Sequence, residues 1–163
     1  MHPTAEPTPR THPSSHPALL LDNQLCFALY SASLAMTKAY KPLLSALGLT
    51  YPQYLVLLVL WEQDDCPVSE LGERLFLDSG TLTPLLKRME AAGWIRRQRH
   101  TSDERKVHIL LTPAGQALQS QAACIPGHMV DALGCSLPEL AQLTQSVQGL
   151  RDRLQATHAV TPA

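Results

Sequence analysis

The sequence lacks the features that would place this chain in a membrane, in a disulfide-rich class or around a metal ion. Its longest apolar run, Tyr54 to Trp61, is far too short to span a bilayer. Its N-terminal segment lacks the apolar core of a signal peptide. None of the four cysteines has CxxC spacing, and no Cys/His cluster approaches the spacing of zinc ligands. We therefore expect a cytoplasmic protein with free thiols, no membrane association, no metal and no cofactor.

The first 17 residues also lack any apolar period. Five prolines alternate there with His, Thr and Ser, so this segment cannot bury enough surface to offset its chain entropy. We expect residues 1–17 to form a disordered tail; metal binding by its three histidines is the less favoured alternative. The rest of the chain is of ordinary length for one domain, and 45% of all residues are hydrophobic, which is ample for a core.

Positive charge is concentrated in one short stretch of the sequence. Seven of the 13 Lys and Arg residues lie between Lys87 and Lys106, together with only three acids. The stretch is therefore +4, while the rest of the chain is −5, giving the formal net charge of −1. A basic face on an otherwise acidic body is the electrostatic pattern of a DNA-binding module. The alternative is a solvated charged face, which is the commoner fate of charge runs.

Hydrophobic periodicity and capping signals predict a mainly helical protein. A long helix is expected from Leu21 to Leu47, and a capping box of Thr50 and Gln53 opens a second helix to about Glu62. Pro42 should kink the first helix near its end. The further expected elements are, in order, a loop at residues 64–67, a helix from 68 to 76, a turn at 77–79, a helix to about 92, strands at 94–99 and 105–111 joined by a hairpin at 100–104, a helix opened by Thr112 and Pro113, and a last helix from the Ser136/Glu139 capping box to about 155.

Two short helices joined by a tight turn and followed by a basic hairpin predict a winged helix–turn–helix. The second helix of such a unit enters the major groove, with polar residues near its N-terminus facing base edges. The hairpin tip reaches phosphates or a minor groove. Arg96, Arg97 and Arg99 would contact phosphates or remain solvated. Leu82, Leu85, Leu86 and Met89 are expected in the core. The candidate DNA-binding residues are Ser79, Thr81, Thr83, Lys87, Arg88, Arg96, Arg105 and Lys106.

With these elements the chain resembles the MarR family of dimeric winged-helix regulators. The residues that carry the resemblance are Asp103-Glu-Arg105, then Leu111-Thr112 and Gly115. The resemblance implies that Asp103 orders the wing, that terminal helices build a homodimer, and that two recognition helices read a pseudo-palindromic double-stranded DNA operator. It implies dimerisation helices at residues 18–49 and 112–157 and a winged helix–turn–helix DNA-binding domain at 50–111. The fold class is thus mainly α with a small β-hairpin.

Cys26, Tyr40 and Tyr51 resemble the reactive cysteine and paired tyrosines of one MarR branch, the organic hydroperoxide resistance regulators. The segments Asp78–Arg88 and Leu49–Tyr54 also resemble that branch. Taken alone, Cys26 reads as a small buried apolar residue, and each tyrosine as a buried ring with a satisfied hydroxyl. On one helix, Tyr40 would point almost the same way as Cys26 but lie roughly 21 Å further along the axis. A contact between them therefore requires two subunits.

The resemblance implies that organic hydroperoxides act as inducers by oxidising Cys26 to a sulfenic acid, after which the repressor releases DNA. The helix start and the Tyr40 and Tyr51 hydroxyls would favour the reacting thiolate. In two-cysteine members of the branch, a cysteine near the last helix then bridges to the reactive one of the opposite subunit. Cys135 is the first choice for this resolving cysteine and Cys124 the second, whereas Asp64 and Asp65 disfavour Cys66.

Two other functions stay open from the sequence. One is a MarR-type repressor controlled by a reversible small-molecule effector, such as a phenolic compound, in the dimer cleft. The other is a thiol peroxidase, which would leave the basic wing unexplained and would need an electron-donor motif that the sequence lacks. We therefore expect a regulator and not an enzyme.

Overall fold

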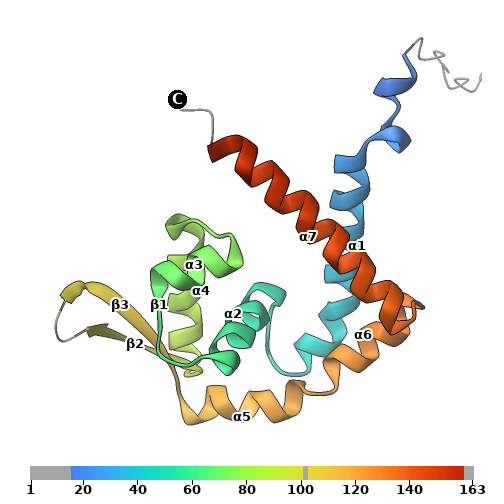
Figure 1. Ribbon diagram of the computed structural model, residues 1–163. Helices are drawn as coiled ribbons and strands as arrows, with labels where there is room; N and C mark the ends of the chain where they lie inside the picture. The colour runs from blue at the N-terminus through green and yellow to red at the C-terminus, as the bar shows by residue number, and fades with distance from the viewer. Residues whose placement is uncertain (1–15, 101–102, 160–163) are drawn as a thin grey trace, which may run out of the picture. The chain divides into compact units, whose positions relative to one another are not determined.

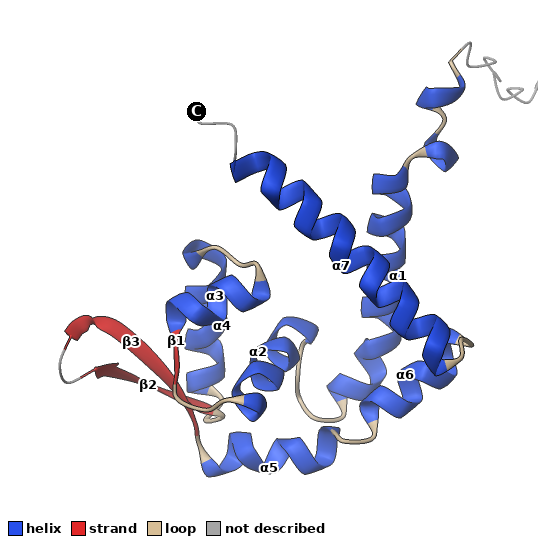
Figure 2. Cartoon of the chain, in the orientation of Figure 1, coloured by secondary structure: helices blue, strands red, loops and turns tan. Residues whose placement is uncertain are grey.

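The computed structural model describes residues 16–100 and 103–159, which are mainly helical with one small antiparallel sheet (Figures 1 and 2). The chain separates into two compact units, residues 1–37 and 38–163, which we take in turn. The predicted disordered tail, apart from His16 and Pro17, lies outside the described residues, as does the hairpin tip at residues 101–102.

The described part of the first unit consists of two 3₁₀ turns, Pro17–Leu19 and Leu21–Asn23, and the first half of α1 (Leu25–Ser45). The long helix thus begins at Leu25 and not at Leu21 as the periodicity predicts. The reason is local: the Asn23 amide donates to Pro17 O at 2.8 Å, and the Gln24 amide donates to Leu20 O at 3.2 Å. These side-chain hydrogen bonds compete with helical pairing. None of the described side chains before Lys38 is buried.

The second unit contains the rest of α1 and all later elements. The helix α2 begins where the capping signal predicts, and the Gln53 side chain accepts the Thr50 N–H at 2.8 Å. The expected boundaries of the next two helices hold to within a residue or so. The elements up to the sheet are α2 (Tyr51–Glu62), β1 (Cys66–Pro67), α3 (Val68–Leu75), α4 (Ser79–Ala91), β2 (Ile95–His100) and β3 (Asp103–Leu111).

The sheet has three antiparallel strands in the order β1-β3-β2, one more than the predicted hairpin. Its additional strand comprises Cys66 and Pro67, which the sequence analysis assigned to a loop and which pair with Ile109 and His108. A two-residue strand has no periodicity of its own, so only the partner strand reveals it. Figure 1 shows the β2–β3 hairpin extending beyond α3 and α4.

A single buried cluster holds the helix–turn–helix to this sheet. The predicted core residues Leu82, Leu85, Leu86 and Met89 are all buried, with exposed fractions of 1–4% for the three leucines and 0% for Met89. They pack in the same cluster as residues of α2, α3 and the strands. Further members of the cluster are Leu57, Leu60, Leu71, Ile95 and Ile109.

Three helices complete the second unit: α5 (Pro113–Ala122), α6 (Ile125–Leu133) and α7 (Leu137–Ala159). The sequence pattern predicts only two helices here and does not show the break before α6. As predicted, Thr112 caps α5 by accepting the Gly115 N–H at 3.1 Å. Ser136 and Glu139 likewise form their capping box, in which the Ser136 N–H donates to Glu139 Oε2 at 2.8 Å. None of the helices in the described ranges is long and apolar enough to cross a membrane.

Helix α7 carries an apolar stripe that the chain itself leaves uncovered. The side chains of Leu143, Val147 and Leu154 are 58%, 42% and 55% exposed, and Leu140 and Leu150 are half-buried. Positions 140, 143, 147, 150 and 154 alternate three- and four-residue steps, which is the heptad pattern of helices that pack against another helix.

Candidate functional site

The helix α4 starts at a well-formed cap. Asp78 accepts the Thr81 N–H at 2.9 Å and the Thr81 hydroxyl at 2.9 Å. These hydrogen bonds, the Thr81 N–H first, hold the pKa of the Asp78 carboxyl below its usual value. The carboxylate therefore stays charged and satisfies the free N–H groups of the first turn. Thr81, a predicted DNA-binding residue, is thus engaged at its own helix cap.

The other predicted residues of α4 form an exposed polar surface. Ser79 and Thr83 are one turn apart, and Lys87 continues the same face. Ser79 and Thr83 also line a groove of about 430 Å³ together with Ser69 at the start of α3 and Arg97 of β2. This groove, between α4 and the sheet, is the surface that joins recognition helix and wing. Lys87, Arg88 and Arg96 are exposed, and Lys87 lies one helical turn after Thr83.

Arg97, in the basic stretch from Lys87 to Lys106, pairs with Glu90, an acid of α4. Its backbone N–H donates to Glu90 Oε1 at 2.9 Å, and its Nε lies 3.4 Å from Glu90 Oε2. Glu90 therefore ties the start of the wing to the recognition helix, a role that the sequence analysis did not assign. The predicted roles of Asp103, Arg105 and Lys106 concern side chains outside those described, although their backbone forms β3.

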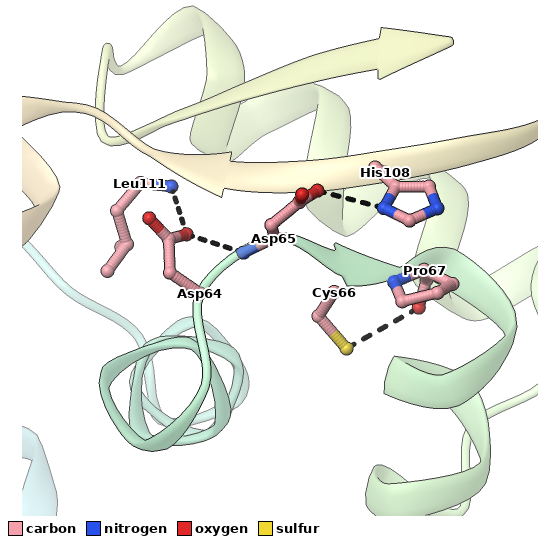
Figure 3. Close-up of polar contacts among 6 residues, drawn as sticks. All are labelled: Asp64, Asp65, Cys66, Pro67, His108 and Leu111. Carbon is pink, nitrogen blue, oxygen red and sulfur yellow. Dashed lines mark hydrogen bonds and ion pairs between the residues drawn. The ribbon is translucent and has the colours of Figure 1, made fainter. Parts of the chain in front are cut away.

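The root of the wing is held by two consecutive acids, Asp64 and Asp65, in the segment that was predicted to be a loop (Figure 3). Asp64 Oδ1 accepts the N–H groups of Asp65 and Leu111, each at 2.8 Å. Asp65 has a positive φ of 59° and places its Oδ1 2.8 Å from His108 Nδ1. Asp tolerates this backbone region better than most residues. The loop between α2 and β1 thus holds β3 by two side-chain contacts, one at Leu111 and one at His108.

Tyr40 and Tyr51, the predicted tyrosine pair, lie together in the second unit. Their ring centroids are 4.9 Å apart, and Tyr54 extends the cluster with its ring 6.1 Å from Tyr40. Burial is the main cause that raises the pKa of all three hydroxyls. At neutral pH they are therefore protonated and can donate hydrogen bonds to an anion. Tyr54 belongs to this cluster although the sequence analysis did not name it.

Cys26 is the second residue of α1 and is exposed. It therefore lies within the first helical turn, where backbone N–H groups lack helical acceptors and favour a nearby anion. Tyr30 follows four residues later, which puts it on the same face of the helix, and it is 62% exposed. The sequence analysis did not single out Tyr30. In the described chain, neither residue has the buried surroundings of an ordinary core side chain.

The other three cysteines differ in accessibility. Cys66 is fully buried, and burial raises the pKa of its thiol. Cys124 is exposed between α5 and α6, and its Sγ is 3.7 Å from Gln121 O. Cys135 is partly buried just before α7, with its Sγ 3.5 Å from Leu133 O. Of these three cysteines, Cys124 is thus the most accessible and Cys66 the least.

A helix–turn–helix followed by a basic hairpin defines a winged-helix protein of the nucleic-acid-binding class. A family model described as "Transcriptional regulator SarA/Rot" matches residues 38–121. The organic hydroperoxide resistance transcriptional regulator of Bacillus subtilis is 52% identical over 134 residues, covering 82% of this chain and 91% of that protein. The transcriptional regulator TtmR of Methylorubrum extorquens is also 52% identical, covering 83% of this chain and 70% of that protein.

Solved structures share this fold. The crystal structure of AbfR of Staphylococcus epidermidis matches with a TM-score of 0.70 at 36% identity, covering 83% of this chain and 94% of that one. AbfR has also been solved in its reduced form bound to DNA and in a disulfide form. The chain therefore belongs to the MarR-like family of winged-helix transcriptional regulators, as a relative of the organic hydroperoxide resistance regulators.

Proposed function

We propose that this protein is a homodimeric repressor that binds a pseudo-palindromic DNA operator and releases it when an organic hydroperoxide oxidises Cys26. The observation that carries the proposal is the pair Tyr40–Tyr51, whose rings meet at 4.9 Å and whose hydroxyls remain protonated donors. The relatives support it: one is named for organic hydroperoxide resistance, and another is known bound to DNA and in a disulfide form.

The DNA-binding half of the proposal rests on charge and exposure. Lys87, Arg88 and Arg96 are exposed, and Ser79 and Thr83 line the groove beside α4. Polar side chains at the start of a recognition helix reach base edges, and basic side chains beside them contact phosphates. Arg105 and Lys106 extend the basic charge along the wing.

The proposal of a homodimer rests on exposed apolar side chains and on helix geometry. The stripe of α7 and Leu25 and Leu34 of α1 are exposed apolar side chains, and contiguous exposed apolar surface is typical of subunit interfaces. Cys26 and Tyr40 are fourteen residues apart in one helix, roughly 21 Å along its axis. A second copy of the chain covers the apolar surfaces and brings its Cys26 to the tyrosine pair.

The proposed chemistry is a two-electron oxidation. The Cys26 thiolate attacks the terminal peroxide oxygen, a sulfur–oxygen bond forms, and the O–O bond breaks to release an alkoxide that becomes the alcohol on protonation. The sulfenic acid then condenses with a second thiol, forming a disulfide and water. Tyrosine hydroxyls stabilise the thiolate before the attack by donating hydrogen bonds to it.

Cys135 remains our first choice for the second thiol and Cys124 our second. Both are accessible, whereas Cys66 is buried with a raised thiol pKa and forms part of the sheet. Non-reducing electrophoresis of Cys135→Ser and Cys124→Ser after hydroperoxide treatment identifies the partner. The variant that lacks it stays monomeric on the gel.

The whole proposal is tested by a gel shift with palindromic DNA, with and without cumene hydroperoxide. The wild type should bind and release on oxidation, and thiol reductant should restore binding. Cys26→Ser should bind equally well and ignore low hydroperoxide concentrations. Release by Cys26→Ser, or release that reductant does not reverse, would contradict the redox mechanism and favour a reversible small-molecule effector.

A further inference from the structure

A cation–π contact connects helix α7 to the turn of the helix–turn–helix. The guanidinium of Arg151 in α7 lies over the ring of Phe76, 4.5 Å from its centroid. This distance is well within the range of a cation–π contact. Arg151 is oriented by its neighbour, because its Nε and Nη2 lie 2.9 Å and 2.8 Å from Asp152 Oδ1.

Phe76 holds an unusual position for an aromatic residue. It ends α3 with a φ of 55° and a ψ of 39°, the left-handed region, where a bulky side chain is strained. Its ring is 53% exposed, so burial in the core does not repay this strain. The Arg151 guanidinium lies over this ring in a cation–π contact. Phe76 is also only two residues before Asp78, the cap of the recognition helix α4.

The contact lies beside a hollow that Phe76 lines. A cavity of about 610 Å³ separates α3, the turn and the start of α4 from α7, and both Phe76 and Gln155 line it. Gln155 is one helical turn after Arg151, so one face of α7 looks onto the cavity.

We propose that Arg151, stacked on Phe76, is a positioning residue that sets the placement of the recognition helix relative to α7. In a dimer joined through α7, this contact in each subunit fixes the distance between the two recognition helices. Operator half-sites are read only at a matching spacing, so the contact determines how strictly the dimer discriminates between spacings. The inference rests on the proposed DNA-binding homodimer and adds a residue pair to it.

The test compares two DNA duplexes. One is selected by the wild-type protein from random palindromic DNA, and the other has one base pair inserted at its centre, which separates and rotates the half-sites. We expect the wild type to prefer the first duplex strongly. In Arg151→Gln the preference should fall about two- to fivefold, the range of an exposed or partly exposed cation–π contact. Arg153→Gln, which removes the same charge from the same helix, should keep the wild-type preference.

A second variant separates positioning from stability. Phe76→Asn removes the ring and also relieves the left-handed strain, because Asn adopts that region readily. Its melting temperature should therefore equal or exceed that of the wild type, while its spacing preference falls as in Arg151→Gln. Arg151→Lys retains a cation over the ring and should recover part of the preference.

The outcomes distinguish the inference from the proposal beneath it. Wild-type preference in both Arg151→Gln and Phe76→Asn would overturn the positioning role alone. A uniform loss of affinity for both duplexes, with a shallower salt dependence, would also overturn it, because that is the signature of a direct phosphate contact. If the wild type selects no DNA, the proposed function fails and the inference fails with it.

Discussion

The winged-helix module (residues 50–111) buries its apolar side chains far more completely than the helices α1 and α7 do. In the module, Leu57, Leu71 and Ile109 are completely buried within one chain. In α1 and α7, Leu25 and Leu143 are 59% and 58% exposed. The module therefore has the core that its fold needs, whereas the long helices present surfaces suited to a second subunit. The winged-helix module has its core within one chain, and the proposed control of DNA binding depends on two chains.

The largest effect should come from a charge on the uncovered stripe of α7. Val147→Glu would bury a carboxylate between subunits, and an uncompensated buried charge costs about 3 kcal/mol or more, over a hundredfold in dimer affinity. The module should remain folded, with an unchanged helical circular dichroism spectrum. Sedimentation velocity measures the loss. Gln145→Glu, on the same helix but off the stripe, is the control, and equal dissociation in both variants would contradict the assignment.

A large effect on stability should come from Gly115, where α5 packs against Trp94 of the module. A Cβ at this position would lie 2.0 Å from Trp94 O, a backbone atom, so α5 would have to move. We expect Gly115→Ala to lower the free energy of unfolding by about 1–3 kcal/mol through overpacking. Gly127→Ala in α6, where a Cβ meets nothing within 4 Å, should instead be neutral or stabilising by up to about 1 kcal/mol. Chemical denaturation of the pair gives the comparison, and a tolerated Gly115→Ala would contradict it.

The wing root should show a smaller loss. Asp64→Ala removes the acceptor of the Asp65 and Leu111 N–H groups, which should lower the free energy of unfolding by about 1 kcal/mol. Asp64→Asn keeps an oxygen acceptor and should lose less. Operator affinity of Asp64→Ala should fall while its dimerisation stays at the wild-type level. Unchanged hydrogen-exchange protection of the Leu111 amide in Asp64→Ala would argue against this role.

The smallest effect concerns pH and the tyrosine cluster. Burial raises the pKa of Tyr40, Tyr51 and Tyr54 above the usual value of 10.0. As the pH rises, the unfolded chain therefore loses these protons before the folded protein does. The contribution of the protonated hydroxyls to the free energy of unfolding is complete below about pH 10 and is lost as the pH rises further. Thermal melts between pH 8 and 11 should show this decline, and Tyr51→Phe should decline less steeply. An equally steep decline in Tyr51→Phe would contradict it.

Local signals predicted much of this structure. The caps at Thr50, Thr112 and Ser136 marked helix starts correctly because each depends on residues within one turn. The break before α6 and the strand β1 were missed. A two-residue strand exists only through its pairing with Ile109 and His108, and such long-range pairing leaves no local pattern.

The same distinction applies to the candidate site. The pair Tyr40–Tyr51 was predicted through family resemblance and is found in contact. The tie between Glu90 and Arg97 and the Asp64–Asp65 clamp were not predicted, because they join elements that are distant along the chain or depend on side-chain direction. Their charges were visible in the sequence but their partners were not.

The central claim, that the oxidation state of one residue in α1 controls the DNA-reading module, is tested most directly by a titration. Reduced dimer on labelled operator is titrated with cumene hydroperoxide, while anisotropy follows DNA release and mass spectrometry follows the Cys26 thiol. We predict that release tracks the loss of the Cys26 thiol point for point. Release with the Cys26 thiol intact, or complete oxidation of Cys26 with the operator still bound, would contradict the account.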